Sequence, residues 1–465
     1  MTRYSQHFVT GLVVLTWLVM TAQAYLLVAR YGQNLPRQDE WEFVPALYGH
    51  EAPLPWIFAR HYEHRYPLAR AVYLTLHTVT GQDFRAGMWV SVTLLSVSAG
   101  VLLLAARKSR GRCDLLDLFI PVLLLNAGHV ENFTMGYQIA FTLTIAWLTV
   151  FLAAVVWSDR LGSRRVALLC GVATLCVALG GAIGWVFVPV LGLFTIGRAV
   201  EAARLSPRRI GNASLLTALP VLAGVYVAAS VVELKLSGAS YPNNNLTTAL
   251  GVAFDFWTVS LGGAGQVGYP LPGIVALGCV VEALVFVAVT FATRPAERVR
   301  VSGCAAVLVG VVMISIVIGV TRPLGNESRY ALFGGLGLCV IILMHAVTSP
   351  TRPLGSPGLL LIPVIAGLIA WQDWQVGVQF SHVYAMLHRD AAPRCPARPP
   401  DQRDRGTPRH LSRVDLPTEL RVAVFQRPQK FTRSRPSTAL AGRATRVAAR
   451  RPPARLRRQR PGTRV

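Results

Sequence analysis

The sequence predicts an all-α integral membrane protein. Its 465 residues are 53% hydrophobic and only 15% charged, with a mean hydropathy of +0.45, which is unlike the composition of a soluble globular protein. The apolar residues form repeated runs of about 20 residues, each long enough to cross a hydrocarbon core of roughly 30 Å. Basic residues gather in several of the segments between these runs, as is typical of the cytoplasmic loops of membrane proteins.

The net charge of +24 is distributed unevenly. Arg389–Val465 holds 21 Arg and Lys against 5 Asp and Glu, so this segment carries +16 of the charge. The first 388 residues carry the remaining +8, which is ordinary for a membrane protein and makes nucleic acid an unlikely partner. The seven cysteines form no Cys-x-x-Cys pair, and we expect those in apolar runs to be small buried residues.

The first span is expected at residues 8–29. A signal peptide is the competing interpretation, because Arg3 precedes the apolar run and Ala22-Gln23-Ala24 resembles a cleavage site. The apolar run continues past that site to Ala29, which favours a retained helix. In both interpretations the chain from Gln33 onward lies on the outer face.

Basic segments set the topology of the remaining spans, because we place them on the inner side. They are Arg107–Arg112, Asp159–Arg165, Arg198–Arg209, Arg294–Arg300 and, more weakly, the region of Arg352. About eleven spans follow, with the amino terminus inside. We expect them at 8–29, 86–106, 115–126, 137–157, two within 166–197 that hinge at 180–184, 213–232, 273–292, 301–320, 330–347 and 358–371.

Two outer loops are expected to carry helices that lie at the membrane interface. One is the loop that follows the first span. The other is Glu233–Pro272, in which residues 246–261 are apolar but cannot cross without reversing the later topology. Trp257 would anchor this second helix in the interface.

Residues 1–388 therefore form the predicted membrane domain, and residues 389–465 form a tail rich in Arg and Pro. The tail cannot build a core, so we expect it to be disordered. Its outer location and strong positive charge leave two interpretations open, a shifted reading frame or a genuine basic arm. A genuine arm would contact anionic lipid headgroups or nucleic acid.

Four polar groups of residues fall on the outer side in this topology. They are Gln38-Asp39-Glu40-Trp41-Glu42, His61-Tyr62-Glu63-His64-Arg65, Gly128-His129-Val130-Glu131-Asn132 and Asn326-Glu327-Ser328-Arg329-Tyr330. Carboxylates at a membrane surface can take a proton from an acceptor hydroxyl, or share a divalent cation with a histidine. An arginine beside them can neutralise a phosphate. Together these residues are suited to a reaction that transfers a chemical group from a phosphate leaving group to an acceptor.

Simpler interpretations stay open for each of these residues. Outer loops are solvated and often charged. A His-x-x-His spacing, as in His61 and His64, is weak evidence for a metal site. Arg329 would also suit the end of a helix, where its charge can reach water. Glu282 lies within an apolar span, where an ionisable residue is a functional hypothesis by default. It favours a different class, a transporter or flippase of lipid-linked or small solutes with a site at the Gly-broken segment 180–184.

The motifs also resemble a known superfamily. An acidic residue just beyond the first helix, a second acidic turn between the third and fourth spans, and many spans with short helices resemble the GT-C glycosyltransferases, which use polyprenyl-phosphate-linked sugars. More closely, QDEWEF, HYEHR, DFRAG, LLNAGHVEN with Gln138, and SRY resemble an uncharacterised bacterial family of GT-C-like membrane proteins. The resemblance covers about residues 8–388.

The resemblance implies sugar transfer with inversion on the outer face. Asp39, with Glu40 beside it, matches the first-loop acid that acts as general base. Glu131, with His129, matches the second-loop acid that positions the acceptor or a divalent metal (Mg²⁺ or Mn²⁺), and Arg329 would hold the donor phosphate. The remaining residues expected to bind substrate are Glu63, His64, Arg65, Gln138 and Tyr330.

The prediction is thus a multi-pass glycosyltransferase-like protein of the bacterial inner membrane. Its expected partners are a lipid-linked sugar donor, a glycan, lipid or protein acceptor, and membrane lipids. A transporter or flippase is the alternative, and a non-catalytic member that only binds a lipid-linked glycan is a third interpretation.

Overall fold

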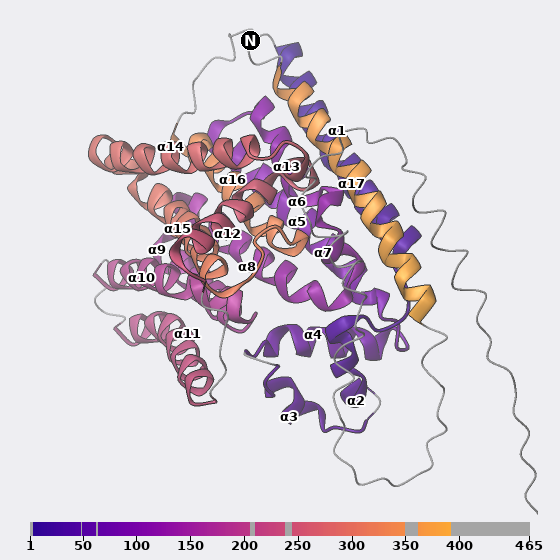
Figure 1. The fold of residues 1–465 in the computed structure, drawn as a ribbon. Coiled ribbons are helices and arrows are strands. Elements are labelled where there is room, and N and C mark those ends of the chain that lie inside the picture. Colours follow the sequence, from indigo (N-terminus) through magenta and orange to yellow (C-terminus); the bar gives the residue numbers. More distant parts are fainter. Residues whose placement is uncertain are drawn as a thin grey trace, which may run out of the picture. The chain divides into compact units, whose positions relative to one another are not determined.

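The computed structural model describes residues 3–47, 49–61, 64–204, 210–237, 244–348 and 361–391. In this part of the chain ten helices are long and apolar enough to cross a membrane, which confirms the predicted all-α, multi-pass class (Figure 1). They are α1 (Arg3–Tyr31), α5 (Arg85–Arg110), α8 (Ile139–Val156), α9 (Ser158–Ala178), α10 (Ala182–Arg204), α11 (Ile210–Leu236), α14 (Leu271–Thr293), α15 (Arg298–Thr321), α16 (Ser328–Thr348) and α17 (Leu361–Ala391). Glu63 and nearly all of the basic tail lie outside the described residues.

The expected hinge in residues 166–197 is present. Helix α9 ends at Ala178 and α10 begins at Ala182, and Gly181 takes a φ of +116° between them. This backbone conformation is accessible to glycine at little cost. The two helices pack against each other as an antiparallel pair.

The segment predicted as the third span is not one long helix. It is broken into η2 (Leu115–Leu118), α6 (Phe119–Leu125), η3 (Ala127–His129), α7 (Val130–Thr134) and η4 (Gly136–Gln138). At one end Asp117 pairs with Arg110 at the close of α5, and at the other end the Tyr137 amide meets Glu40, beyond the far end of α1. The segment therefore runs from one end of the helix bundle to the other, and we call it the broken crossing.

The broken crossing is enclosed by the other helices. Of residues 115–138, all but Leu116, Phe119 and Glu131 are buried. Non-helical backbone at membrane depth is tolerated only where protein surrounds it, because lipid cannot satisfy free amides and carbonyls. Hydrophobicity alone predicted the crossing, but only the surrounding helices make its broken form stable.

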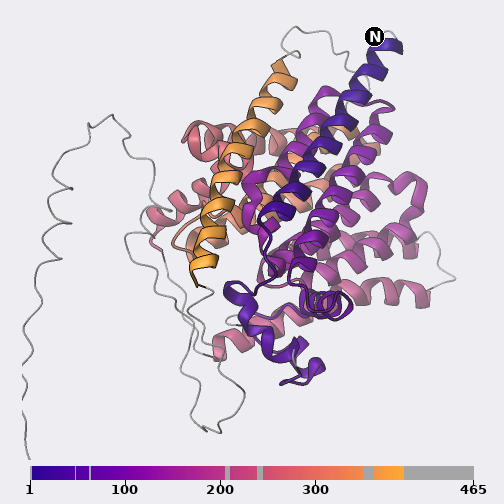
Figure 2. The same ribbon diagram turned by 90° about the vertical axis from the view of Figure 1, so that its right-hand side faces the viewer.

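Helix α17 is longer than the predicted span at 358–371. It continues to Ala391 and runs beside α1 (Figures 1 and 2). The predicted span ended at Trp371, but Asp373, two residues later, is fully buried. The apolar pattern of the sequence could not indicate that a polar residue is buried inside the bundle.

The second expected loop helix is present as a short apolar helix, and its second half is buried in the bundle. The loop contains α12 (Leu246–Thr258), η6 (Val259–Leu261) and α13 (Gly263–Val267). Trp257 is 2% exposed, so it is not an anchor at the membrane surface as predicted. Glycines in α16 allow this loop to pack closely against the helix, since a Cβ at Gly334 would lie 2.6 Å from the Cβ of Ser260.

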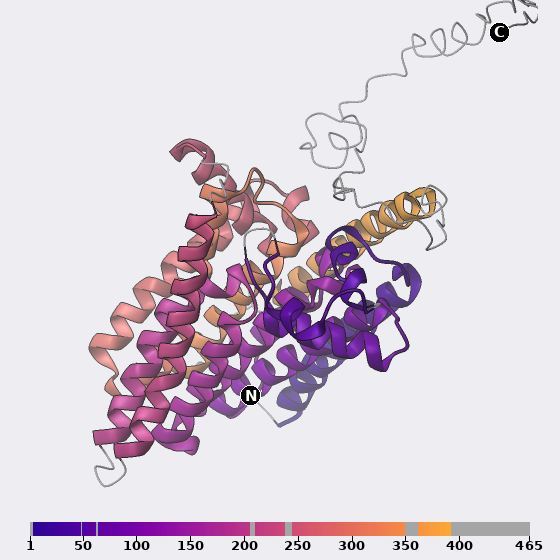
Figure 3. The same cartoon turned by 90° about the horizontal axis from the view of Figure 1, so that it is seen from below.

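The first long loop, residues 32–84, forms a small layer over one end of the bundle, which we call the loop end (Figures 1 and 3). It contains η1 (Gln38–Glu42), α2 (Val44–Leu47), α3 (Pro53–Phe58) and α4 (Pro67–Val79). Proline begins both α3 and α4, where its missing N–H and fixed φ suit the first helical turn. An aromatic cluster of Phe43, Trp56, Tyr66, Tyr73 and Tyr137 packs the layer onto the start of α8.

Candidate functional site

Glu40 anchors the first loop to the broken crossing. Its side chain is fully buried, and the Arg37 amide donates a hydrogen bond to Oε2 (2.8 Å). The Tyr73 hydroxyl (3.0 Å) and the Tyr137 amide (2.9 Å) both donate to Oε1. Because these donors occupy both oxygens and no surface of Glu40 is exposed, the geometry suits a structural role better than the predicted catalytic one.

Asp39, the neighbouring residue, faces the other way. Its side chain is 34% exposed, and Oδ2 lies 3.7 Å from Nε2 of His61. The other ring nitrogen of His61, Nδ1, lies 2.6 Å from Oε2 of Glu42. A buried imidazole is thus held between two half-exposed carboxylates.

The electrostatics of this trio favour its charged form. Burial would raise the pKa of Asp39, but His61, followed by Arg329 and His64, outweighs burial and lowers it. Burial would likewise lower the pKa of His61, but Asp39 and Glu42 together raise it. Both shifts favour the ionised form of Asp39 and the protonated form of His61.

His64 lies next to His61 in a short backbone bridge. The amide of each residue donates to the carbonyl of the other, at 2.8 and 3.0 Å. Burial, reinforced by the charges of His61 and Arg322, lowers the pKa of His64 to about 3. His64 is therefore neutral at physiological pH, and its enclosed Nδ1 makes no hydrogen bond within the described part of the chain.

Arg65 ties the first loop to the end of α11. Its Nη2 lies 2.7 Å from Oε1 of Glu233, and both side chains are partly exposed. An exposed pair of this kind contributes little to stability. The pair brings the His61–Arg65 segment beside residues that lie about 170 positions later in the chain.

Glu131 and Arg329 meet across the mouth of the bundle. Oε2 of Glu131 accepts from the Ser328 hydroxyl (3.0 Å) and from the Arg329 amide (3.2 Å), so it caps the start of α16. The Arg329 guanidinium pairs with Glu327 and lies over the ring of Tyr330, 5.4 Å from its centre. The charge of Arg329 also lowers the pKa of Asp39. This electrostatic influence, with the Glu131–Arg329 contact, indicates that the first, third and fourth predicted groups lie in one region of the loop end.

Gln138 and Tyr330 are buried beneath this cluster rather than exposed to it. The Gln138 amide donates to the sulfur of Met135 (3.4 Å), and the ring of Tyr330 stacks on Phe141. Their predicted contact with substrate therefore needs a change of conformation or an intervening group.

His129 does not form a metal site with Glu131. It is fully buried, with Nε2 2.7 Å from the carbonyl oxygen of Leu123. Among the described residues no three His, Cys, Asp or Glu side chains gather closely enough to hold a metal ion. The donor set does not fit a protein-held cation, and the metal requirement stays a prediction.

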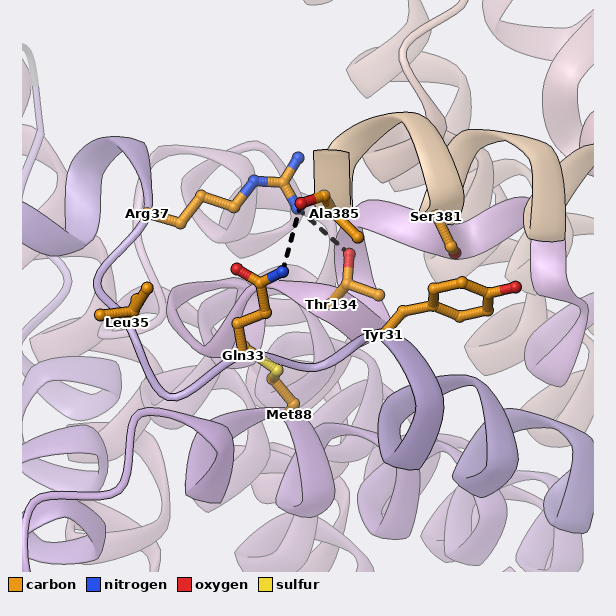
Figure 4. A pocket seen from close by; sticks show the side chains of 8 residues that line it. All are labelled: Tyr31, Gln33, Leu35, Arg37, Met88, Thr134, Ser381 and Ala385. Atoms are coloured by element: carbon orange, nitrogen blue, oxygen red, sulfur yellow. Dashed lines mark hydrogen bonds between the residues drawn. The ribbon is translucent and has the colours of Figure 1, made fainter. Parts of the chain in front are cut away.

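A small pocket opens beside the loop end, between the end of α1 and α17 (Figure 4). Arg37 donates to the Thr134 hydroxyl (3.2 Å) on one side of it, and the Gln33 amide donates to the Ala385 carbonyl on another. It has room for about one water molecule. The pocket is too small to be the substrate site.

Sequence reasoning missed two parts of the arrangement. It did not select His61 and Glu42, although both stand in motifs that it examined, because their contact depends on how the loop folds. It also did not single out Asp373, because the span predicted at 358–371 ended two residues before it, so the cost of an ionisable residue within a span was not applied to it. No protein-family model matches the chain, and no curated protein matches it either.

Proposed function

We propose that the protein is a membrane glycosyltransferase that transfers a sugar from a polyprenyl-phosphate donor to an acceptor hydroxyl at the loop end of the bundle. The observation that carries the proposal is the convergence of a partly exposed, ionised Asp39 with Arg329. Such a transfer needs a base for the proton of the acceptor hydroxyl and a positive group for the leaving phosphate. A carboxylate and a guanidinium at one membrane-surface site can fill these two roles.

In the proposed reaction the acceptor oxygen forms a bond to the anomeric carbon as the bond from that carbon to the donor phosphate breaks. Asp39 takes the hydroxyl proton, and Arg329 stabilises the negative charge that develops on the leaving lipid phosphate. The lowered pKa of Asp39 makes it a weak base in isolation, so its contribution grows only as the hydroxyl becomes acidic in the transition state.

His61 and Glu131 act as positioning residues in this proposal. His61 holds the carboxylate of Asp39 from one side, and Glu42 fixes the imidazole from the other. Glu131 fixes the first turn of α16 and thereby the backbone of Arg329. Such supporting contacts matter because a catalytic group must be held within a fraction of an ångström of its working position.

The test is sugar transfer by membranes that contain the Asp39→Asn variant and a polyprenyl-phosphate sugar. We expect kcat to fall by about 10²–10⁴-fold, because the amide cannot accept the proton. Asp83→Asn is the matched control: Asp83 lies in the same loop but is paired with Arg85, and its variant should keep full activity. Undiminished transfer by a folded Asp39→Asn variant excludes the base role.

A transporter of lipid-linked or small solutes is the second candidate, and the broken crossing favours it. Transporter sites often lie where spanning helices are interrupted. Glu282 no longer supports this candidate, because its side chain is 53% exposed on α14 and contacts His345 (3.3 Å). Purified protein in vesicles distinguishes the two: an enzyme forms a glycosylated product, whereas a transporter moves the donor across the bilayer unchanged.

A further inference from the structure

Asp373 is a fully buried acid within the apolar part of α17. It lies 12 residues before Ala385, or about 18 Å along the helix at 1.5 Å per residue. Ala385 marks the loop end, because its carbonyl accepts from Gln33 just beyond α1. Asp373 is therefore well inside the bundle and separate from the site proposed above.

Three elements meet around this side chain. The amide of Ala264, in the first turn of α13, donates to Oδ1 (2.6 Å), and the amide of Gly263 also faces the carboxylate. Gly377, one turn further along α17, packs directly on η3, where a Cβ would lie 2.3 Å from the carbonyl oxygen of Ala127. The contact region joins α17, the broken crossing and the α12–α13 loop.

Two oxygen atoms in this region lack a hydrogen-bond donor within the described residues. They are Oδ2 of Asp373 and Oδ1 of Asn126, and both are enclosed. A Cβ placed on Gly262 would lie 2.5 Å from Asn126 Oδ1 and 2.7 Å from each oxygen of Asp373. The two acceptors therefore surround one point, although two acceptors repel unless a positive group lies between them.

No basic side chain is available to supply that charge in the part of the chain that the structure describes. The groups that face Asp373 are the backbone amides of α13 and the side chain of Asn126. His129, a titratable group on the broken crossing, contacts the amide nitrogen of Asn126 (3.2 Å) and the carbonyl of Leu123 rather than the carboxylate. An ionised carboxylate at this depth without a counter-charge is costly.

A metal cation does not fit between the two oxygens. Hard cations such as Ca²⁺ take six to eight oxygen ligands, whereas only two unpartnered oxygens are present here. The backbone of Gly262 also comes close to both groups, since a Cβ on it would lie 2.5–2.7 Å from their oxygens, and this leaves little space for further ligands. A proton needs one donor atom and one acceptor atom, which is what the site supplies.

We propose that Asp373 is a proton-binding site, at which the neutral carboxylic acid donates a hydrogen bond to Oδ1 of Asn126. The bound proton joins α17 to the broken crossing and to the α12–α13 loop. Loss of the proton would leave a negative carboxylate that repels Oδ1 of Asn126 where these elements meet. The site gives the protein a means of coupling its packing to pH or to a proton gradient, whichever function the loop end performs.

Infrared spectroscopy of the purified full-length protein tests the proposal. We expect the carbonyl stretching band of a protonated carboxylic acid at neutral pH, slow to shift in D₂O because the group is buried. Aspartate carboxyls are ¹³C-labelled, because the buried Glu40, with a pKa of about 7, gives an unlabelled band of its own. The labelled band should be lost in Asp373→Asn and kept in Asp83→Asn, whose carboxylate is partly exposed and paired with Arg85. Retention of the labelled band in Asp373→Asn would overturn the assignment.

Absence of the band from the unmodified protein would also overturn the proposal. It would mean that Asp373 is ionised and that the Asn126 amide is turned, with its nitrogen donating to the carboxylate; oxygen and nitrogen of an amide are assigned from such networks. If Asp373→Asn does not fold, unmodified protein with a ¹³C-labelled aspartate carboxyl decides the question, because the band must then shift. The other buried aspartate in the described residues, Asp117, is paired with Arg110 and gives no such band.

Discussion

At the level of single residues, Asp39 and Glu40 are neighbours with opposite environments. The 3₁₀ turn of η1 directs Glu40 into the aromatic layer and leaves Asp39 at the surface beside His61. Burial raises the pKa of Glu40 to about 7, although the amides of Arg37 and Tyr137 and the Tyr73 hydroxyl partly oppose the shift. The acid pair in the sequence therefore divides into an anchor and a reactive group.

The raised pKa of Glu40 predicts a pH-dependent stability. Between about pH 4.5 and pH 7 the unfolded chain releases a proton that the folded protein keeps. The free energy of unfolding should thus fall as the pH rises through this window, by on the order of 3 kcal/mol, and then level off. Unfolding measured in detergent across this range checks the slope.

Glu40→Gln should flatten this slope, because an amide does not titrate. It should also destabilise the protein by about 1–3 kcal/mol, since the amide nitrogen would face a hydrogen-bond donor. Glu51→Gln, at an exposed position of the same loop, is the control and should keep the slope of the unmodified protein. Equal slopes in the unmodified protein and in Glu40→Gln would show that another group titrates.

At the level of elements, glycines decide which helices approach one another closely. Gly87 at the start of α5 packs on Gly136 of η4, where a Cβ would lie 2.6 Å from the Gly136 carbonyl oxygen. Gly377 of α17 makes the similar approach to η3. The loop end and the broken crossing are positioned by these backbone contacts.

Gly377→Ala should therefore destabilise the protein. The added methyl would meet backbone atoms of Ala127 at 2.3–2.6 Å, and overpacking of this kind typically costs about 1–3 kcal/mol. Gly367→Ala in the same helix is a matched control, because nothing lies within 4 Å of its added Cβ. Thermal unfolding of both variants checks the prediction, and equal stability would contradict the tight approach of α17.

At the level of the whole molecule, the proposed function depends on the orientation in the membrane. The loop end carries Asp39 and Arg329, whereas the basic end of α5 lies at the opposite end, where Arg110 pairs with Asp117. The positive-inside rule predicts that the loop end faces outward. The described contacts between helices are the same in either orientation.

Cysteine labelling tests this orientation. A membrane-impermeant maleimide should label Glu51→Cys, in the first loop, on intact cells. It should label Lys108→Cys, at the basic end of α5, only after the cells are permeabilised. Both positions are exposed, so the reverse pattern would place the loop end inside and remove access to an outer lipid-linked donor.

The sequence by itself determined the membrane class, nearly all the spans and the segments that carry polar chemistry. These features follow from hydrophobic runs and charge, which are local properties that any window of the chain displays. The resemblance to GT-C enzymes and the choice of Asp39 and Arg329 also came from local motifs. Their roles remain proposals.

Only the tertiary structure decided which polar residues are exposed and which are buried. Glu40 and Asp39 differ in exposure because the loop folds onto Tyr73 and Tyr137. Trp257 is buried because glycines in α16 leave room for its ring. The broken crossing and the buried Asp373 depend on neighbours far away in the chain. Burial and partner choice are properties of several segments packed together, so no single segment could display them.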